Sequence, residues 1–224
     1  MNGFISSFQR TARLTARHPL DAAHAVAFFI IVTSLISVTV DNATTSGNRD
    51  AFVIAIMWVV VLLATMLGCA AAYSQDYEDG SLELLVAHQR PLFPSVLGSM
   101  MGLWFFSTLP ILLCVPLGAW MLTLSTSVWW MLLLTLLAGS IVFTLFGVLG
   151  AVLTLGIGRN GVLMALLVLP LYVPVLLLGV GACQRYANGE TFEFALASLF
   201  AIAVALVTFV PFAIAALLRV SQEY

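Results

Sequence analysis

The sequence predicts an all-α integral membrane protein with six transmembrane helices, and three observations lead to this fold class. First, 62% of the 224 residues are hydrophobic and only 8% are charged, whereas soluble domains are about one-quarter charged. Second, apolar runs of about 20 residues, the length that crosses a bilayer, recur six times. Third, the few arginines gather beside these runs. We therefore expect lipid to surround most of the chain.

The first element, residues 1–19, is predicted to be an amphipathic helix ahead of a six-helix domain in 20–224. Its cationic face holds Arg10, Arg13 and Arg17. The nearly opposite face holds Phe4, Ile5, Phe8 and Ala12. Such a helix is expected to lie in the membrane interface, with its arginines near lipid phosphates. A disordered positive leader is the alternative.

Six apolar segments follow, and each is predicted to be a membrane span. They are Ala22–Val40, Ala51–Tyr73, Ser95–Leu124, Val128–Leu155, Gly161–Cys183 and Phe194–Leu218. The third contains Pro110 and Pro116, which favour a kink because proline removes a backbone donor. The fifth contains Pro170 and Pro174, and we expect these to kink it or to break it into a partial or re-entrant piece.

The arginines predict the orientation, because they gather on the cytoplasmic side of membrane proteins. With six spans both termini share one side, and that side carries six of the eight arginines. The six are Arg10, Arg13, Arg17, Arg90, Arg159 and Arg219, and the remaining two are Arg49 and Arg185. Both termini are therefore predicted to be cytoplasmic.

Several kinds of chemistry are excluded or disfavoured. A P-loop requires a lysine to reach the phosphates of ATP, and the chain contains none. The net charge of −2 gives no basic field for nucleic acid. The span interiors are nearly free of ionisable groups, which disfavours ion-coupled carriers, intramembrane proteases and other polytopic enzymes. Residues 156–161 match GxGxxG but join two spans, so they predict a tight turn. Energy for any movement must come from outside the membrane.

Isolated residue types give weaker predictions. The histidines, His18, His24 and His88, share no ligand spacing, so we expect interfacial anchors, with a haem or metal ligand as the alternative. The cysteines, Cys69, Cys114 and Cys183, predict small buried side chains rather than disulfides. Gly98 and Gly102 form a small-xxx-small pair, which favours close helix packing within the chain or across a homodimer.

The loop at residues 74–91 is the most unusual stretch, because it holds four of the ten acidic residues. Asp79 or Ser81 can cap a short helix, and Glu83 suits its positive first turn. An apolar stripe follows at helical spacing, made of Leu82, Leu85 and Val86. A short cytoplasmic helix that binds a protein partner is predicted. A helix lying on its own chain or on lipid is the alternative.

This loop, Glu78-Asp79-Gly80-Ser81-Leu82-Glu83-Leu84-Leu85, resembles the coupling-helix loop of ABC-2-type permeases. More closely, nearly the whole chain resembles the cytochrome c maturation protein B family, also called haem exporter protein B or CcmB. The matching strings are Gln75 through Leu85, Leu109-Pro110 with Val115-Pro116-Leu117, Leu149 through Thr154, Leu166 to Val175, and Pro211-Phe212-Ala213 with Ala215 through Arg219.

The resemblance implies an ABC-2-type permease fold in the bacterial inner membrane and a non-catalytic role in cytochrome c biogenesis. It implies a separate ABC ATPase subunit of the cytochrome c maturation protein A type, which binds ATP. The coupling residues in a cleft of that ATPase would be Asp79, Gly80, Ser81, Leu82, Glu83, Leu84 and Leu85. Other maturation subunits, a haem chaperone and a second permease copy would complete the complex. Haem would be a transported or handled ligand.

Two alternatives stay open at this stage. The same loop is compatible with an ABC-2 exporter of lipid, polysaccharide or drug. The absence of a visible substrate site is compatible with a non-transporting membrane scaffold. The residues also leave open whether haem passes through this subunit or whether the subunit transmits ATP-driven motion that releases a haem-loaded chaperone from a neighbour.

Overall fold

The computed structural model describes residues 2–17, 19–43, 49–78, 92–153 and 161–220. Within these ranges every regular element is a helix. The elements are α1 (Asn2–Arg17), α2 (Pro19–Ala43), α3 (Arg49–Glu78), α5 (Leu92–Leu103), the π-helix η1 (Trp104–Thr108), α6 (Leu109–Met121), α7 (Thr126–Leu153), α8 (Gly161–Ala187) and α9 (Glu193–Val220). The predicted all-α membrane fold is confirmed.

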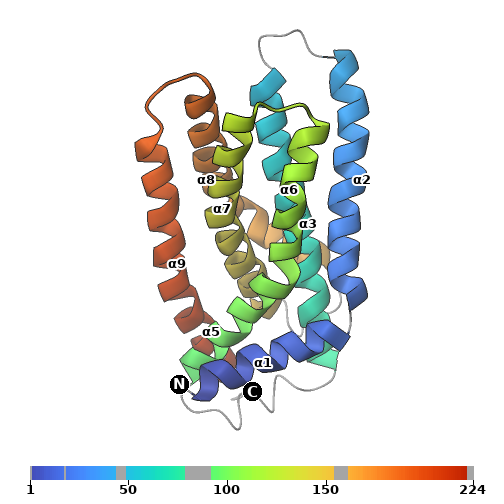
Figure 1. Cartoon of the computed structure of the whole chain (residues 1–224). Coiled ribbons are helices and arrows are strands. Elements are labelled where there is room, and N and C mark those ends of the chain that lie inside the picture. Colours follow the sequence, from blue (N-terminus) through green and yellow to red (C-terminus); the bar gives the residue numbers. More distant parts are fainter. Residues whose placement is uncertain (1, 18, 44–48, 79–91, 154–160, 221–224) are drawn as a thin grey trace.

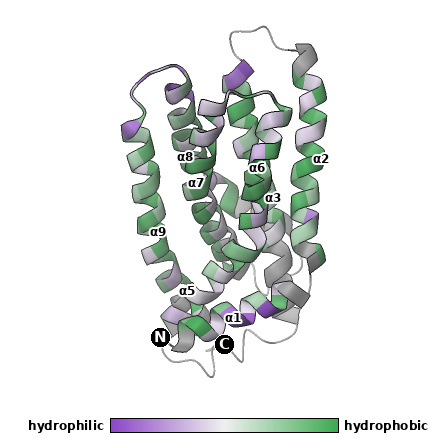
Figure 2. Cartoon of the chain, in the orientation of Figure 1, coloured by the Kyte–Doolittle hydropathy of each residue, from purple (hydrophilic) through white to green (hydrophobic). Residues whose placement is uncertain are grey.

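The six predicted spans are also confirmed as helical segments long and apolar enough to cross a membrane. Five are single helices, and α5, η1 and α6 together make the third. Figure 1 shows them as an upright bundle, with α1 lying across one end and the turns α6–α7 and α8–α9 at the other. Apolar residues dominate the described parts of the bundle, and the strongly hydrophilic ones gather at its ends and on α1 (Figure 2).

The third span bends, as its prolines predicted. Figure 1 shows α5 inclined and α6 upright, with η1 between them. The backbone N–H of Leu109 donates to the carbonyl of Trp104, five residues back, and Pro110 has no N–H to donate to the carbonyl of Phe106. The π-turn itself was not predicted. Pro116 lies inside α6 without ending it.

Two boundaries differ from prediction. Of the two outcomes expected for the fifth span, a kink or a break, the break does not occur, because α8 runs as one α-helix through Pro170 and Pro174. Between these prolines Tyr172 is fully buried and donates its hydroxyl to the carbonyl of Phe143 at 3.0 Å, so α7 holds the helix where its own hydrogen bonds are interrupted. The predicted loop at 74–91 begins too early, since α3 continues to Glu78. The predicted turn at 156–161 lies outside the described residues, except for Gly161.

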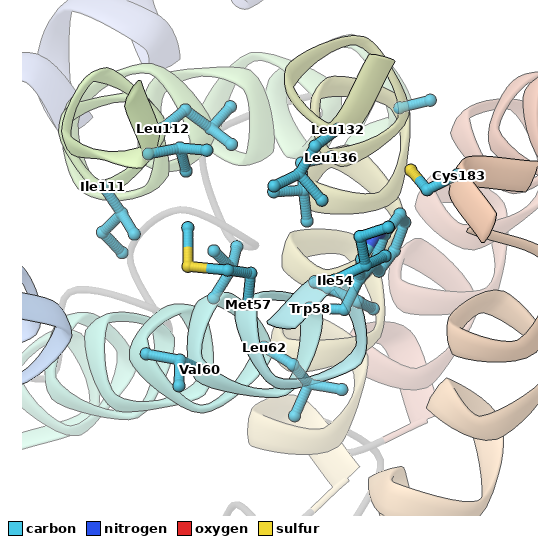
Figure 3. Close-up of a cluster of buried hydrophobic side chains, with 14 of the residues drawn as sticks. Ile54, Met57, Trp58, Val60, Leu62, Ile111, Leu112, Leu132, Leu136 and Cys183 are labelled. Atoms are coloured by element: carbon cyan, nitrogen blue, oxygen red, sulfur yellow. The ribbon is translucent and has the colours of Figure 1, made fainter. Parts of the chain in front are cut away.

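The core is centred on Trp58 of α3, which is fully buried. Its ring meets Phe143 of α7 edge-on, with ring centroids 5.8 Å apart. Gly139 of α7 and Gly179 of α8 make room for it, because a Cβ at either position would overlap the indole ring. Figure 3 shows Trp58 reaching toward Cys183 of α8, beside Leu132 and Leu136 of α7. The indole therefore joins three helices.

Polar contacts add to this junction of α3, α7 and α8. The hydroxyl of Thr135 lies 3.1 Å from the sulfur of Cys183, between α7 and α8. The side-chain amide of Gln184 donates to the carbonyl of Ala51 at 3.1 Å, between α8 and α3. Hydrogen bonds and dense packing together make these three helices a fixed block.

The turns after α6 and α8 share one backbone motif. In each, the first residue beyond the cap has a left-handed backbone, Thr123 at φ 53° and Gly189 at φ 72°. Each turn has two closing bonds from backbone N–H to carbonyl. They are Leu124 to Ala119 and Thr123 to Trp120 after α6, and Glu190 to Arg185 and Gly189 to Tyr186 after α8. This is the Schellman arrangement, and only Thr123 fills it with a β-branched residue.

Thr123→Gly is expected to stabilise the protein, and Gly189→Thr to destabilise it, by about 0.5–1 kcal/mol each, because glycine alone adopts this backbone without strain. Thr123 is exposed, and no atom lies within 4 Å of a Cβ added at Gly189, so backbone strain dominates both changes. Thermal unfolding in detergent should show midpoint shifts of about 2 °C in opposite directions. Shifts of the same sign would contradict this account.

Candidate functional site

The predicted coupling residues, Asp79 to Leu85, lie outside the described residues, and their role stays a prediction. The structure does fix the helices on either side. α3 ends at Glu78 and α5 begins at Leu92, and both positions lie at the end of the bundle that carries α1 (Figure 1). Residues 79–91 are therefore joined along the chain to the ends of α3 and α5.

α5 is covered by α1 through the small-xxx-small pair. A Cβ at Gly98 would collide with the carbonyl oxygen of Phe4, which is backbone and cannot rotate away. A Cβ at Gly102 would lie 2.9 Å from the Cβ of Thr11. The two glycines therefore let α1 approach α5 at backbone distance. Of the two packing modes predicted for this pair, the structure shows the one within the chain.

α1 meets α5 with part of the apolar face that was predicted to enter the membrane interface. Residues 2–17 form the expected helix, and Phe8 packs against Phe105 and Phe106 of η1, with ring centroids 6.4 and 6.0 Å apart. Ser7, which the helical wheel did not single out, is only 1% exposed. Ile5 remains 49% exposed. Part of the face expected to enter lipid is thus buried against protein, because the glycines of α5 let the backbone of α1 approach closely.

The opposite side of α5 contacts α9. The rings of Phe93 and Phe212 stack with centroids 4.2 Å apart. The start of α5 therefore packs against both α1 and α9. Both contacts lie close to the point where the chain leaves residues 79–91, so these residues connect directly to a packed helix.

A row of uncharged hydrogen bonds joins the π-turn to α7. The indole N–H of Trp104 donates to the hydroxyl of Ser140 at 3.0 Å, and the hydroxyls of Thr108 and Thr144 lie 3.0 Å apart. Ser107 faces Gly68 of α3, where an added Cβ would lie 3.7 Å from the Cβ of Ser107. Sequence reasoning missed this row. Hydroxyl residues inside otherwise apolar spans were the available signal.

The described residues hold no group of three His, Cys, Asp or Glu side chains that could bind a metal ion. His24 is exposed on α2, whereas His18 and His88 lie outside the described residues. All three cysteines have free thiols, with Cys69 and Cys183 buried and Cys114 partly buried.

Gly98→Ala is expected to loosen α1, since overpacking costs about 2 kcal/mol, or about a 30-fold increase in opening. A Ser7→Cys reporter in a Cys114→Ala background should then react with maleimide about 30 times faster than it does when Gly98 is kept. Gly181→Ala is the control, because nothing lies within 4 Å of a Cβ added there. Equal labelling rates in the two variants would contradict the packing of α1 on α5.

Comparisons with known proteins cover nearly the whole chain. The model of the family described as CcmB protein matches residues 2–221. Heme exporter protein B of Pseudomonas aeruginosa is 40% identical over 220 residues, 98% of each chain. The protein of the same name from Paracoccus denitrificans is 37% identical over 95% of this chain and 96% of its own length. The one from Escherichia coli K12 is 35% identical over 98% of this chain and 99% of its own length. The chain belongs to the CcmB protein family.

Proposed function

We propose that this chain is the permease subunit of an ABC transporter complex in cytochrome c biogenesis, where it couples ATP hydrolysis in a separate subunit to conformational change. The observation that carries the proposal is the family match over residues 2–221. Relatives of almost the same length are named heme exporter protein B, which favours haem export or the handling of haem. The two alternatives, an ABC-2 exporter of another substrate and a non-transporting scaffold, gain no such support.

The energy is proposed to come from an ATPase of the cytochrome c maturation protein A type. The chain has no lysine and therefore no P-loop of its own. α7, which lies in the middle of the packed helices, has no charged residue that an ion or proton pathway would use. Asp79 to Leu85 would fit into a cleft of that ATPase. Four acidic residues between 74 and 91 favour a protein partner over the anionic lipid surface, which would repel them.

The role proposed for haem is indirect. A haem held here would be bound through apolar or propionate contacts, because the span interiors offer no evident haem ligand. We favour a subunit that transmits ATP-driven strain and so releases a haem-loaded chaperone from a neighbouring maturation subunit. The complex would contain two copies of this chain in the bacterial inner membrane, with both termini cytoplasmic, as the arginine distribution predicts.

Glu83→Lys tests the coupling interface, because reversing one charge at a charged protein contact places like charges together and costs several kcal/mol. A loss of about 2 kcal/mol would weaken ATPase binding about 30-fold. We expect the tagged variant to lose the ATPase during purification from membranes, and cells that carry it to lack c-type cytochromes. Haem staining of membrane proteins provides the second measurement.

Glu190→Lys is the matched control for charge reversal. Glu190 is exposed in the turn between α8 and α9, at the opposite end of the bundle. This variant should retain both the ATPase and the cytochromes. Normal cytochrome formation in the Glu83→Lys strain would sink the proposed function, and equal defects in both variants would point to misfolding of the charged forms instead of a coupling contact.

A further inference from the structure

We propose that η1 is the hinge of the third span, about which α5 and α1 turn together while α6 stays in place. The inference rests on the proposed function, since ATP-driven motion supplies the force. It concerns a different part of the chain from the coupling segment, and it assigns roles to Trp104, Ser107 and Thr108, which contact α7 and α3.

The backbone of η1 is suited to bending. Its hydrogen bond from Leu109 to Trp104 spans five residues instead of four. Because Pro110 has no N–H, the carbonyl of Phe106 lacks the donor that a regular α-helix would provide. π-turns occur mostly as single insertions in α-helices and are frequent at functional sites. The usual ladder of backbone bonds is therefore interrupted where α5 meets α6.

The helix before the hinge forms one body with α1. Gly98 and Gly102 bring α1 to backbone contact with α5, and a packed contact of this kind moves as a unit because it resists compression. Phe8 of α1 continues the contact onto Phe105 and Phe106. Since residues 79–91 lead into α5, a partner that pulls on this segment would pull on α1 and α5 together.

The helix after the hinge is tied to other helices. Gly118 of α6 is enclosed by Phe29 and Thr33 of α2 and by Met57 of α3, each within 3.2 Å of an added Cβ. The hydroxyl of Ser37 donates to the carbonyl of Met121 at 2.9 Å. α3 in turn belongs to the block with α7 and α8 around Trp58. α6 is therefore held by α2 and α3, whereas α5 shares a buried apolar cluster with α3, α7 and α9 and must slide within that cluster as it turns.

The contacts of η1 with its neighbours fit a moving joint. Trp104 and Thr108 meet α7 through single hydrogen bonds between uncharged groups. Such a bond contributes only about 1 kcal/mol net. A change in the bend must break these two bonds and shift Trp104, which also packs against the buried core, along α7. The Thr135–Cys183 contact, by contrast, lies inside the fixed block.

A disulfide between Thr108→Cys and Thr144→Cys would pin the hinge to α7, because the two hydroxyls that it replaces are 3.0 Å apart. The variant is made in a Cys114→Ala background and purified with its ATPase. We expect the reduced complex to hydrolyse ATP as the parent does. Oxidation should lower the rate about tenfold or more, equivalent to about 1.4 kcal/mol in the barrier, and a thiol reductant should restore it.

The matched control is Thr135→Cys, whose new thiol lies beside native Cys183 on α8. Its disulfide joins two helices of the fixed block, so ATP hydrolysis should be unchanged after oxidation.

A second hinge variant, Gly68→Cys with Ser107→Cys in a Cys69→Ala background, pins η1 to α3 across 3.7 Å between Cβ positions, a normal disulfide spacing. This second variant tests the same hinge if the first variant fails to fold.

The outcomes separate the hinge from the function on which it rests. Full ATP hydrolysis after quantitative oxidation of a hinge variant would overturn the hinge and leave the proposed function intact. Equal loss in the hinge and control variants would also overturn it, because any cross-link would then suffice. If the parent chain neither binds an ATPase nor supports its hydrolysis, the proposed function is wrong and the hinge falls with it.

Discussion

The backbone contact of α1 with α5 over Gly98 and Gly102 determines how the end of the bundle beside residues 79–91 is built. It removes part of an amphipathic helix from the lipid interface and joins it to the first half of the third span. The same span then bends at η1, where Pro110 interrupts the backbone ladder. The part of α5 that packs against α1 is therefore followed, within the same span, by the interrupted backbone of η1.

The sequence predicts the six spans and their order well, because the bilayer demands about 20 apolar residues whatever the partners are. It predicts contacts poorly. Gly98 and Gly102 indicate close packing but not which helix packs on them. Ser7 is buried in the structure, although its position in the sequence does not single it out. Pro170 and Pro174 left a kink or a break open, and α8 stays continuous where Tyr172 bonds to α7. Neighbouring helices decide such cases, and their positions are not encoded locally.

The candidate site likewise contains residues that the sequence singles out and residues that only the folded structure brings together. Residues 79–85 stand out in the sequence by charge and capping pattern, whereas Trp104, Thr108, Ser140 and Thr144 become a row only when η1 lies against α7. A fixed block around Trp58, a helix pair formed by α1 and α5, and a weak backbone between them suit a subunit whose task is to change shape. Uncharged spans fit that task, since no ion or proton pathway is required.

Affinity purification of the tagged chain from its native membrane, followed by identification of bound subunits and measurement of the haem absorption band, tests the central claim most directly. The account predicts an ABC ATPase subunit in a constant ratio to the chain, together with other cytochrome c maturation subunits. It predicts a haem band that follows those neighbours and disappears when the chain is purified alone. A chain recovered without any ATPase, under conditions that preserve membrane complexes, would contradict the account.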